Sequence, residues 1–232
     1  MKKDSSGKAS AIEVAGGFGV VWNGREARTP ARAPLCVPTR ALAAAIAAEW
    51  GAQSAKIQPH TMPMMQFAST AIDRVPVYRE DIVAEVAEYA GTDLLCYRAA
   101  TPEKLTERQR AAWQPLLDWA GERYDVVFRS TQGVVPIDQP SETQERMTSV
   151  VASMDDFTLA GIQTLVGGLG SLVLALAVLE GRLAADIAFE LSQIEEDYQA
   201  ETWGEDTLAS ERRSRIAQEM QDAEMYLGLL TA

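Results

Sequence analysis

The stretch that decides the fold is Leu159–Asp206, with the sequence LAGIQTLVGGLGSLVLALAVLEGRLAADIAFELSQIEEDYQAETWGED. Its first part, Leu159–Leu179, contains no charged residue, whereas its last part is densely acidic and ends in Trp203-Gly204-Glu205-Asp206. Between them, apolar residues recur at the spacing of one helical face, namely Ile187, Leu191, Ile194 and Tyr198. This pattern predicts that the carboxy-terminal half of the chain is helical.

The uncharged part, Leu159–Leu179, is long enough to cross a bilayer, because a membrane helix needs about 20 apolar residues. Its composition is poor for a membrane helix, since it contains Gln163, Thr164 and Ser171 and is rich in glycine. We therefore interpret it as a segment buried inside the protein and expect no membrane partner. A membrane span is the alternative interpretation.

The acidic part begins with Glu195-Glu196-Asp197 and allows three interpretations. It is a solvated helix face, a surface that binds a partner, or a site for Mg²⁺ or Ca²⁺, which prefer oxygen ligands. Glu195 and Glu196 point in different helical directions, and the sequence has no calcium-binding loop motif or Glu-x-x-His pair. The metal site is the least favoured of the three, and we predict none.

The charge of the chain limits its partners. The formal net charge is −12 and the pI is about 4.6, which disfavours nucleic acid, because proteins that bind it carry clustered Lys and Arg. The charge is also uneven, with a net +4 over residues 1–40 and a net −8 over residues 181–232. The two ends of the chain therefore differ in their electrostatic surfaces.

The cysteines and the first residues favour a reducing compartment. Cys36 and Cys96 are too few and too far apart for a disulfide framework or a zinc site, so both are predicted to be free thiols. The basic residues near Met1 are not followed by an apolar core, so they do not form a secretory signal. We expect a cytoplasmic protein.

The amino-terminal part contains signals for a β-hairpin and a helix. Phe18–Trp22 is apolar and prone to form a strand, Asn23-Gly24 is a strong hairpin-turn signal, and Arg25–Thr29 follows as a second strand. Thr39 is placed to cap an amphipathic helix that includes Trp50.

The remaining periodicity is mostly helical and predicts an α+β protein. A second small hairpin is expected between Asp125–Phe128 and Val134-Val135. The predicted organisation is a disordered tail over residues 1–10, a β-containing amino-terminal α/β domain over residues 11–78, and a larger, mainly helical domain over residues 79–232.

The sequence lacks a recognisable set of catalytic residues. His60 is the single histidine and lies between prolines, and no glycine-rich loop ends in Lys-Ser or Lys-Thr as a phosphate site of the Walker kind requires. We predict no enzymatic activity and no cofactor. A metal-dependent enzyme that uses the acidic helix face is the alternative function.

Several blocks in a fixed order resemble a known family. They are Pro38-Thr39 with Ala47–Trp50, Met62–Met64 with Thr70–Arg74, Gly170–Ala177 with Leu179–Gly181, Glu196–Gln199, and Trp203–Asp206. These blocks resemble the assembly chaperones that act on the alpha subunit of the F(1) sector of ATP synthase in mitochondria and alpha-proteobacteria. Mitochondrial members continue differently after the Trp-Gly pair, so the direct succession of Glu205 and Asp206 resembles the bacterial type.

The resemblance implies a monomeric chaperone that binds the unassembled alpha subunit and covers the surface which the beta subunit later occupies. It implies a structural role for Trp50 and a partner-binding role for the acidic segment, with Glu196 or Glu205 as the main contact. The predicted partner-binding residues are Glu195, Glu196, Tyr198, Gln199, Trp203, Glu205 and Asp206.

Overall fold

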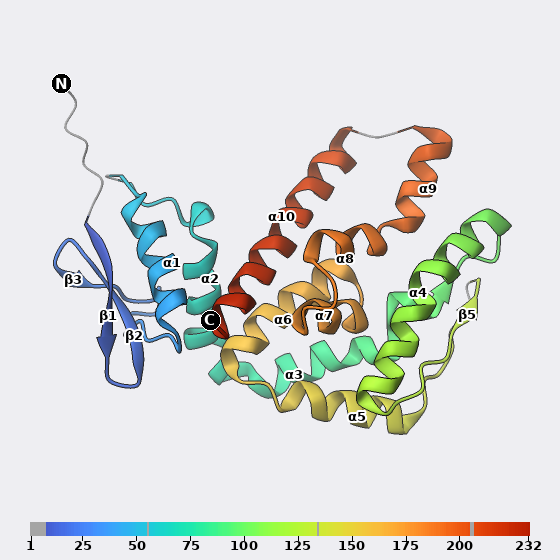
Figure 1. Ribbon diagram of the computed structural model, residues 1–232, viewed down its shortest axis with the longest axis horizontal. Helices are drawn as coiled ribbons and strands as arrows, with labels where there is room; N and C mark the ends of the chain where they lie inside the picture. The colour runs from blue at the N-terminus through green and yellow to red at the C-terminus, as the bar shows by residue number, and fades with distance from the viewer. Residues whose placement is uncertain (1–7, 55, 134, 205–206) are drawn as a thin grey trace. The chain divides into compact units, whose positions relative to one another are not determined.

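The computed structural model describes residues 8–54, 56–133, 135–204 and 207–232, and the chain divides into two units. The first unit contains the chain up to Arg79 together with Asp155–Gly161 and Met225–Ala232, and the second contains Glu80–Met154 and Ile162–Glu224. A small sheet near the start is followed by a mainly helical part, as Figure 1 shows, so the predicted α+β class is confirmed. The sequence interpretation did not foresee that two later segments join the first unit, and the predicted domain limits stay a proposal.

The sheet of the first unit has three antiparallel strands in the order β1 (Ala9–Val14), β2 (Gly17–Trp22) and β3 (Arg25–Glu26). Trp22 pairs with Arg25 across a turn in which Asn23 and Gly24 have φ values of 51° and 78°. Left-handed angles at both positions are what this type of hairpin turn requires, so the predicted hairpin is confirmed.

Strand β1 corrects the predicted tail. Ala9 and Ser10 were assigned to the tail, but they pair with Trp22 and Val21 of β2. The pairing depends on the facing strand, which the short local pattern of β1 does not reveal. Residues 1–7 lie outside the described part of the chain.

Helix α1 (Arg40–Gly51) packs on β1 and β2 with Leu42, Ala43, Ile46 and Ala47 buried. The hydroxyl of Thr39 accepts a hydrogen bond from the Leu42 N–H at 3.1 Å, which confirms the predicted cap. The Glu49 carboxylate accepts hydrogen bonds from the N–H groups of Met64 and Met65, at 2.7 and 2.9 Å. This contact joins α1 to the first turn of α2 (Pro63–Ser69), which follows the 3₁₀ turn η1 (Pro59–Thr61).

The π-helical turn η2 (Thr70–Arg74) connects α2 to α3 (Val75–Thr92). The segments Asp155–Gly161 and Met225–Ala232, which come later in the sequence, complete the first unit. Phe67 of α2 stacks on Tyr226 with 4.7 Å between ring centroids, and the Thr39 hydroxyl donates to the Leu229 carbonyl at 2.5 Å. Gly161 permits a close approach here, because a Cβ at this position would lie 2.6 Å from the Leu227 side chain.

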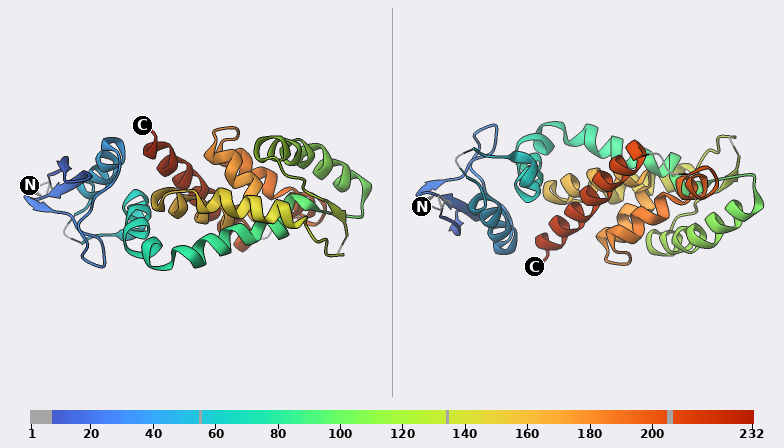
Figure 2. Two further views of the ribbon diagram at one scale, coloured as in Figure 1. Left: turned by 90° about the horizontal axis from the view of Figure 1, so that it is seen from below. Right: turned by 90° about the horizontal axis from the view of Figure 1, so that it is seen from above.

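The second unit is built from helices around a short central one. Its longer helices are α4 (Glu103–Tyr124), α5 (Ser141–Ala152), α6 (Asp156–Leu169) and α10 (Thr207–Leu230), of which α6 begins and α10 ends in the first unit. The shorter ones are α7 (Leu172–Leu179), α8 (Ala185–Ser192) and α9 (Ile194–Trp203). Helix α7 packs against α4 and α8 and is buried from Leu172 to Val178, while α3 and α5 lie side by side (Figures 1 and 2).

The second predicted hairpin is wrong for its described residues, since Asp125–Phe128 and Val135 form no strand there; Val134 lies outside the described part of the chain. After the 3₁₀ turn η3 (Leu94–Cys96), strand β4 (Tyr97–Arg98) pairs in parallel with β5 (Thr131–Gln132). The buried Gln139 side chain holds the loop before β5, since it accepts from the Arg129 N–H at 2.8 Å and donates to the Arg129 carbonyl at 2.7 Å. The backbone polar groups of Arg129 are therefore satisfied by Gln139 and not by a local hairpin.

The uncharged stretch is divided between α6 and α7. Gly170 has a φ of 64°, and the Ser171 hydroxyl caps α7 by accepting from the Leu174 N–H at 3.0 Å. The buried Asp93 carboxylate accepts from the Ser171 hydroxyl at 2.7 Å and from the Val173 N–H at 3.0 Å. Among the described residues, no helix combines the length and the apolar character that a membrane crossing requires.

Candidate partner-binding site

A groove of about 750 Å³ lies in the second unit between α6, α9 and α10. Helix α9 supplies one wall, α6 the floor and α10 the other wall. The lining residues are Gln163, Thr164, Gly167, Gly168, Gln193, Glu196, Gln199, Ala200, Trp203, Gly204, Ser210, Arg212, Arg213, Ile216, Glu219 and Met220. We call this concavity the α9 groove.

Helix α9 is short, and its sequence explains where it begins and ends. Glu195, Glu196 and Asp197 occupy its first turn, where negative charge interacts favourably with the helix dipole. Gly204 ends the helix with a φ of 93°, a conformation that glycine adopts most readily. Ile194 is the buried residue that anchors the helix, so most of the remaining surface of α9 is available to solvent or to a partner.

The floor of the groove depends on two adjacent glycines of α6 with different surroundings. A Cβ on Gly168 would lie 2.3 Å from the Met220 Cε atom, so this glycine permits α6 and α10 to pack closely. A Cβ on Gly167 would meet nothing within 4 Å. Gly167 therefore leaves open space in the floor of the α9 groove.

Trp203 is the most exposed large apolar side chain along the groove, at 78% exposure. It lies in the last turn of α9 and lines the groove together with the apolar Ile216 and Met220 of α10. Tryptophan is enriched among residues that dominate binding energy at protein interfaces. An exposed Trp beside an apolar concavity is therefore suited to contact a protein partner.

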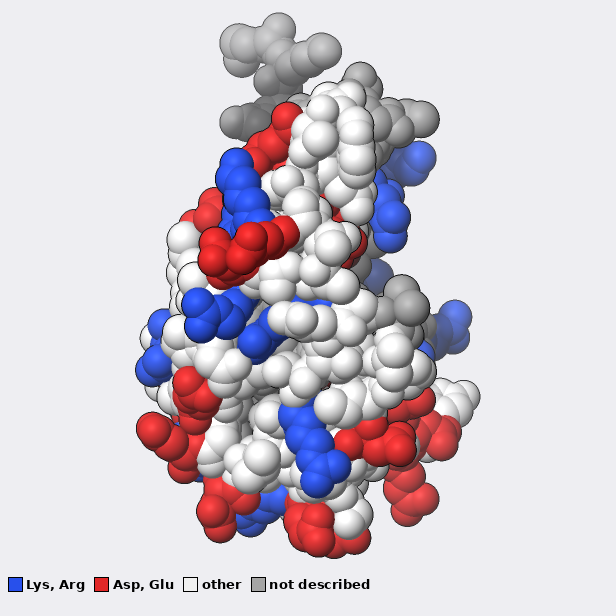
Figure 3. All heavy atoms as spheres, turned by 90° about the vertical axis from the view of Figure 1, so that its right-hand side faces the viewer, with Lys and Arg blue, Asp and Glu red and all other residues white. Residues whose placement is uncertain are grey.

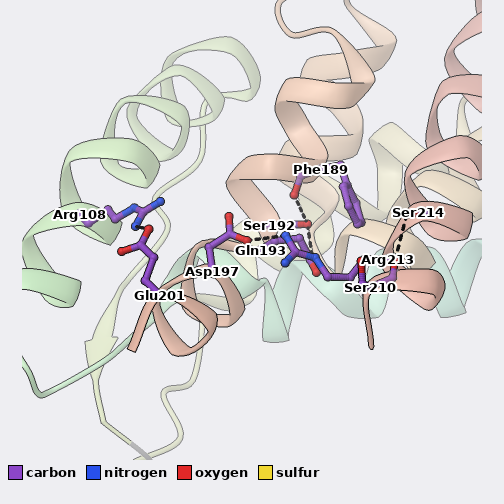
Figure 4. A network of polar contacts seen from close by, with 9 residues as sticks. All are labelled: Arg108, Phe189, Ser192, Gln193, Asp197, Glu201, Ser210, Arg213 and Ser214. Carbon is purple, nitrogen blue, oxygen red and sulfur yellow. Dashed lines mark hydrogen bonds and ion pairs between the residues drawn. The ribbon is translucent and has the colours of Figure 1, made fainter. Parts of the chain in front are cut away.

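Ion pairs connect α9 to its neighbours, as Figure 4 shows. Asp197 pairs with Arg213 of α10, and Glu201 accepts from Arg108 of α4 at 2.7 Å. The hydrogen bond from Arg108 lowers the pKa of Glu201. Ion pairs near the surface contribute little stability, so the main effect of these two is to orient α9 and to occupy two of its carboxylates within the fold.

The structure brings together part of the predicted site. Glu196, Gln199 and Trp203 line the α9 groove, whereas Glu195 and Tyr198 are not among its lining residues. Glu205 and Asp206 lie outside the described residues. The assignment of these positions to partner binding stays a prediction.

Sequence reasoning missed the opposite wall. Arg212 and Arg213 line the groove across from α9, and Gly167 opens its floor. The basic run at Arg212-Arg213 is the signal that could have indicated a charged wall. The contact between α6, α9 and α10 joins residues far apart in the sequence, and no local pattern reports it.

Trp50, for which a structural role was predicted, lies in the first unit. Its ring is 5.0 Å from that of Trp22, with an angle of 43° between the planes. This packing is compatible with the predicted role, which stays a prediction.

Charged side chains of both signs lie on one face of the molecule (Figure 3). On the face seen in Figure 3, acidic and basic side chains are interspersed with uncharged surface. Within the described part of the chain, no group of three or more His, Cys, Asp or Glu residues is arranged to hold a metal ion. The lining of the α9 groove combines the apolar Ile216 and Met220 with charged side chains of both signs.

Comparisons with known proteins assign the family. A family model described as "ATP12 chaperone protein" matches residues 4–121. The mitochondrial protein atp12 of Schizosaccharomyces pombe (strain 972 / ATCC 24843) is 27% identical, and the match covers 78% of this chain and 67% of that protein.

Solved structures agree in fold over almost the whole chain. The crystal structure of Atp12 from Paracoccus denitrificans is 39% identical with a TM-score of 0.94, and the match covers 96% of each chain. The Atu1473 protein of Agrobacterium tumefaciens is 36% identical with a TM-score of 0.91, and the match covers 96% of this chain and 84% of that one. The chain therefore belongs to the ATP12 chaperone family.

Proposed function

We propose that this chaperone binds the unassembled alpha subunit of the F(1) sector of ATP synthase and shields the surface which the beta subunit later occupies. Membership of the ATP12 chaperone family supports an assembly role. The single structural observation that carries the proposal is the exposed Trp203 beside the α9 groove. We place the contact there and expect a cytoplasmic monomer.

The physical need for such a protein follows from ring assembly. A subunit of an alternating ring exposes apolar contact surface before its neighbour arrives, and such surface promotes aggregation. A chaperone that covers this surface keeps the subunit soluble. Binding through an apolar groove edged by Trp203 and Glu196 supplies both burial and a charged rim.

Release requires no catalysis in this proposal. If the beta subunit and the chaperone contact the same surface of the alpha subunit, the two compete, and the more stable ring displaces the chaperone. A ligand shifts such an equilibrium only through its difference in affinity for the two states. The chain therefore needs neither a cofactor nor nucleotide hydrolysis.

Co-expression with the alpha subunit tests the proposal through Trp203. The Trp203→Ser variant removes a large exposed ring and should weaken alpha-subunit binding by about 2 kcal/mol or more, as expected for an interface hot spot. The matched control is Val127→Ser, because Val127 is 67% exposed in the same unit and does not line the groove. Soluble alpha subunit should fall with Trp203→Ser and remain with Val127→Ser.

Equal recovery of soluble alpha subunit with both variants would remove Trp203 from the binding surface. Failure of the unchanged chain to raise the soluble fraction at all would contradict the proposed function itself. Thermal unfolding of both variants checks that any loss comes from the surface, since exposed substitutions usually change stability little.

A further inference from the structure

Gly167 is a helical glycine whose missing side chain no contact of the described residues explains. It lies in the last turn of α6 and its φ is not positive, so the backbone there does not require glycine. A Cβ at Gly167 would meet nothing within 4 Å, whereas a Cβ at Gly168 would lie 2.3 Å from Met220. Because alanine is a better helix former than glycine, Gly167 lowers the stability of the helix without a gain in packing among the described residues.

The space at Gly167 lies in the α9 groove, next to apolar side chains. Gly167 is exposed and lines the groove. A Cβ at the neighbouring Gly168 would lie 3.5 Å from Ile216 Cγ2 and 2.3 Å from Met220 Cε, so both side chains of α10 lie against this end of α6. Met220 is buried, while Ile216 is partly exposed. We call this part of the groove, defined by Gly167, Ile216 and Met220, the glycine recess.

The glycine recess suits a large apolar side chain from another protein. The whole groove has a volume of about 750 Å³, which is within the range of about 300–1,000 Å³ for ligand sites, so it has room for several side chains of a bound segment. Trp203 lines the same groove and adds exposed apolar surface. A Leu, Ile or Met side chain that enters the recess leaves water for contact with apolar atoms, which favours binding.

Two charged side chains without a partner in the described part of the chain line the groove as well. They are Glu196 on α9 and Arg212 on α10, and both are exposed. The other charged side chains of the lining are engaged, since Arg213 pairs with Asp197, as Figure 4 shows, and Glu219 forms a longer pair within α10. Complementary charge in a partner therefore means a basic residue at Glu196 and an acidic residue at Arg212.

We propose that the α9 groove binds a segment of the alpha subunit in which a large apolar residue is flanked by a basic residue on one side and an acidic residue on the other. The apolar side chain enters the glycine recess, the basic residue faces Glu196 and the acidic residue faces Arg212. Gly167 thereby determines whether the side chain of the partner fits. The segment belongs to the partner of the proposed function, on which this inference rests.

Isothermal titration of the unchanged chain and of two Gly167 variants against purified alpha subunit tests the recess. Gly167→Ala should weaken binding by about fivefold and Gly167→Leu by about fiftyfold, because the added atoms occupy the space that the partner's side chain needs. The thermal midpoint of Gly167→Ala should stay or rise, since a Cβ meets no other atom in the unbound chain. A loss of affinity without a loss of stability separates a binding role from a structural one.

Gly228 is the matched control for the size of the side chain. Like Gly167, it is exposed, lies two residues before the last residue of its helix, and has nothing within 4 Å of a Cβ. It does not line the α9 groove. Gly228→Ala and Gly228→Leu should therefore keep the affinity for the alpha subunit within about twofold of the unchanged chain.

A second pair of variants tests the charge. Arg212→Gln should weaken binding of the alpha subunit by about fivefold, because it removes the group that faces the acidic residue of the segment. Arg215→Gln removes the same charge from the same helix at a residue that does not line the groove, so it should change the affinity by about twofold at most.

The inference is overturned if Gly167→Leu binds the alpha subunit as tightly as Gly228→Leu does. A fall in the thermal midpoint of Gly167→Ala that accompanies its loss of affinity would overturn it as well, since the fold itself then needs the glycine. Equal effects of Arg212→Gln and Arg215→Gln would remove the acidic residue from the proposed segment. Failure of the unchanged chain to bind the alpha subunit would instead contradict the proposed function. If Gly167→Leu does not fold, the comparison of Gly167→Ala with Gly228→Ala decides the outcome.

Discussion

At the scale of single residues, charge reversal at Glu196 and at Glu195 distinguishes a direct contact in the α9 groove from an effect of the overall charge of α9. The two are adjacent and exposed, but Glu196 lines the groove and Glu195 does not. We expect Glu196→Lys to weaken alpha-subunit binding by about tenfold, roughly 1.4 kcal/mol, because reversed charge at a rim disturbs complementarity. Isothermal titration against purified alpha subunit measures this.

The matched variant Glu195→Lys changes net charge by the same amount and should leave the affinity within about threefold. Both variants should keep the thermal midpoint, since exposed substitutions rarely cost stability. Equal losses in the two variants would point to long-range attraction instead of a local contact.

Asp93 is a buried carboxyl group of the second unit whose titration is coupled to stability. Burial raises its pKa from 3.8 to about 6, although hydrogen bonds from Val173, Ser171 and Leu95 act in the opposite direction. The folded state therefore binds the proton more tightly than the unfolded state does. The resulting stabilisation is full below about pH 4 and is lost as the pH rises through 6.

Relative to Asp93→Asn, which does not titrate, the unchanged chain should lose about 2 kcal/mol of unfolding free energy between about pH 4 and pH 6.5. Urea unfolding followed by circular dichroism at several pH values measures the difference. A difference that stays constant, or that changes in favour of the unchanged chain as the pH rises, would show that the hydrogen bonds outweigh the effect of burial.

At the scale of elements, the packing of α6 on α10 depends on Gly168 and not on Gly167. Gly167→Ala should raise stability by about 0.5–1 kcal/mol, because a Cβ there meets nothing within 4 Å and alanine favours helix. Gly168→Ala displaces the end of the buried Met220 side chain and should be less stable than Gly167→Ala by about 1–3 kcal/mol.

Thermal unfolding of the two alanine variants measures this difference directly. Equal midpoints would mean that Met220 adopts another rotamer without cost and that the close approach of α6 and α10 does not need a glycine.

The local features of the fold could be predicted from the sequence, whereas the pairings of distant residues could not. The Asn23-Gly24 turn and the Thr39 cap depend on neighbouring residues, and the structure confirms both. The parallel pairing of Tyr97 with Thr131 and the bond from Ser171 to Asp93 join distant positions. No local pattern encodes such partners, which is why a hairpin was predicted in place of β5.

The candidate site could likewise be predicted only where it depends on neighbouring residues of one helix. The acidic run of α9 was visible in the sequence, and Glu196 and Trp203 line the groove. The basic wall from Arg212 and Arg213 and the open floor at Gly167 arise only when α6 and α10 pack together. Sequence reasoning therefore found one wall of a groove that three elements build.

At the scale of the whole molecule, the proposed binding of the alpha subunit requires more contact surface than one pocket supplies. Stable protein–protein interfaces bury about 1,600 Å² in total, which exceeds what the α9 groove alone offers a partner. The sequence is unevenly charged, with +4 over residues 1–40 and −8 over residues 181–232, so charge is expected to contribute to such an interface. Binding should therefore weaken with salt, though apolar contacts such as that of Trp203 should persist.

Recovery of the tagged chain from a lysate of its own cells tests the central claim most directly. We predict that free alpha subunit is recovered with the chain, without a stoichiometric amount of beta subunit. Recovery of assembled ATP synthase only, or of no alpha subunit, would contradict the proposed function.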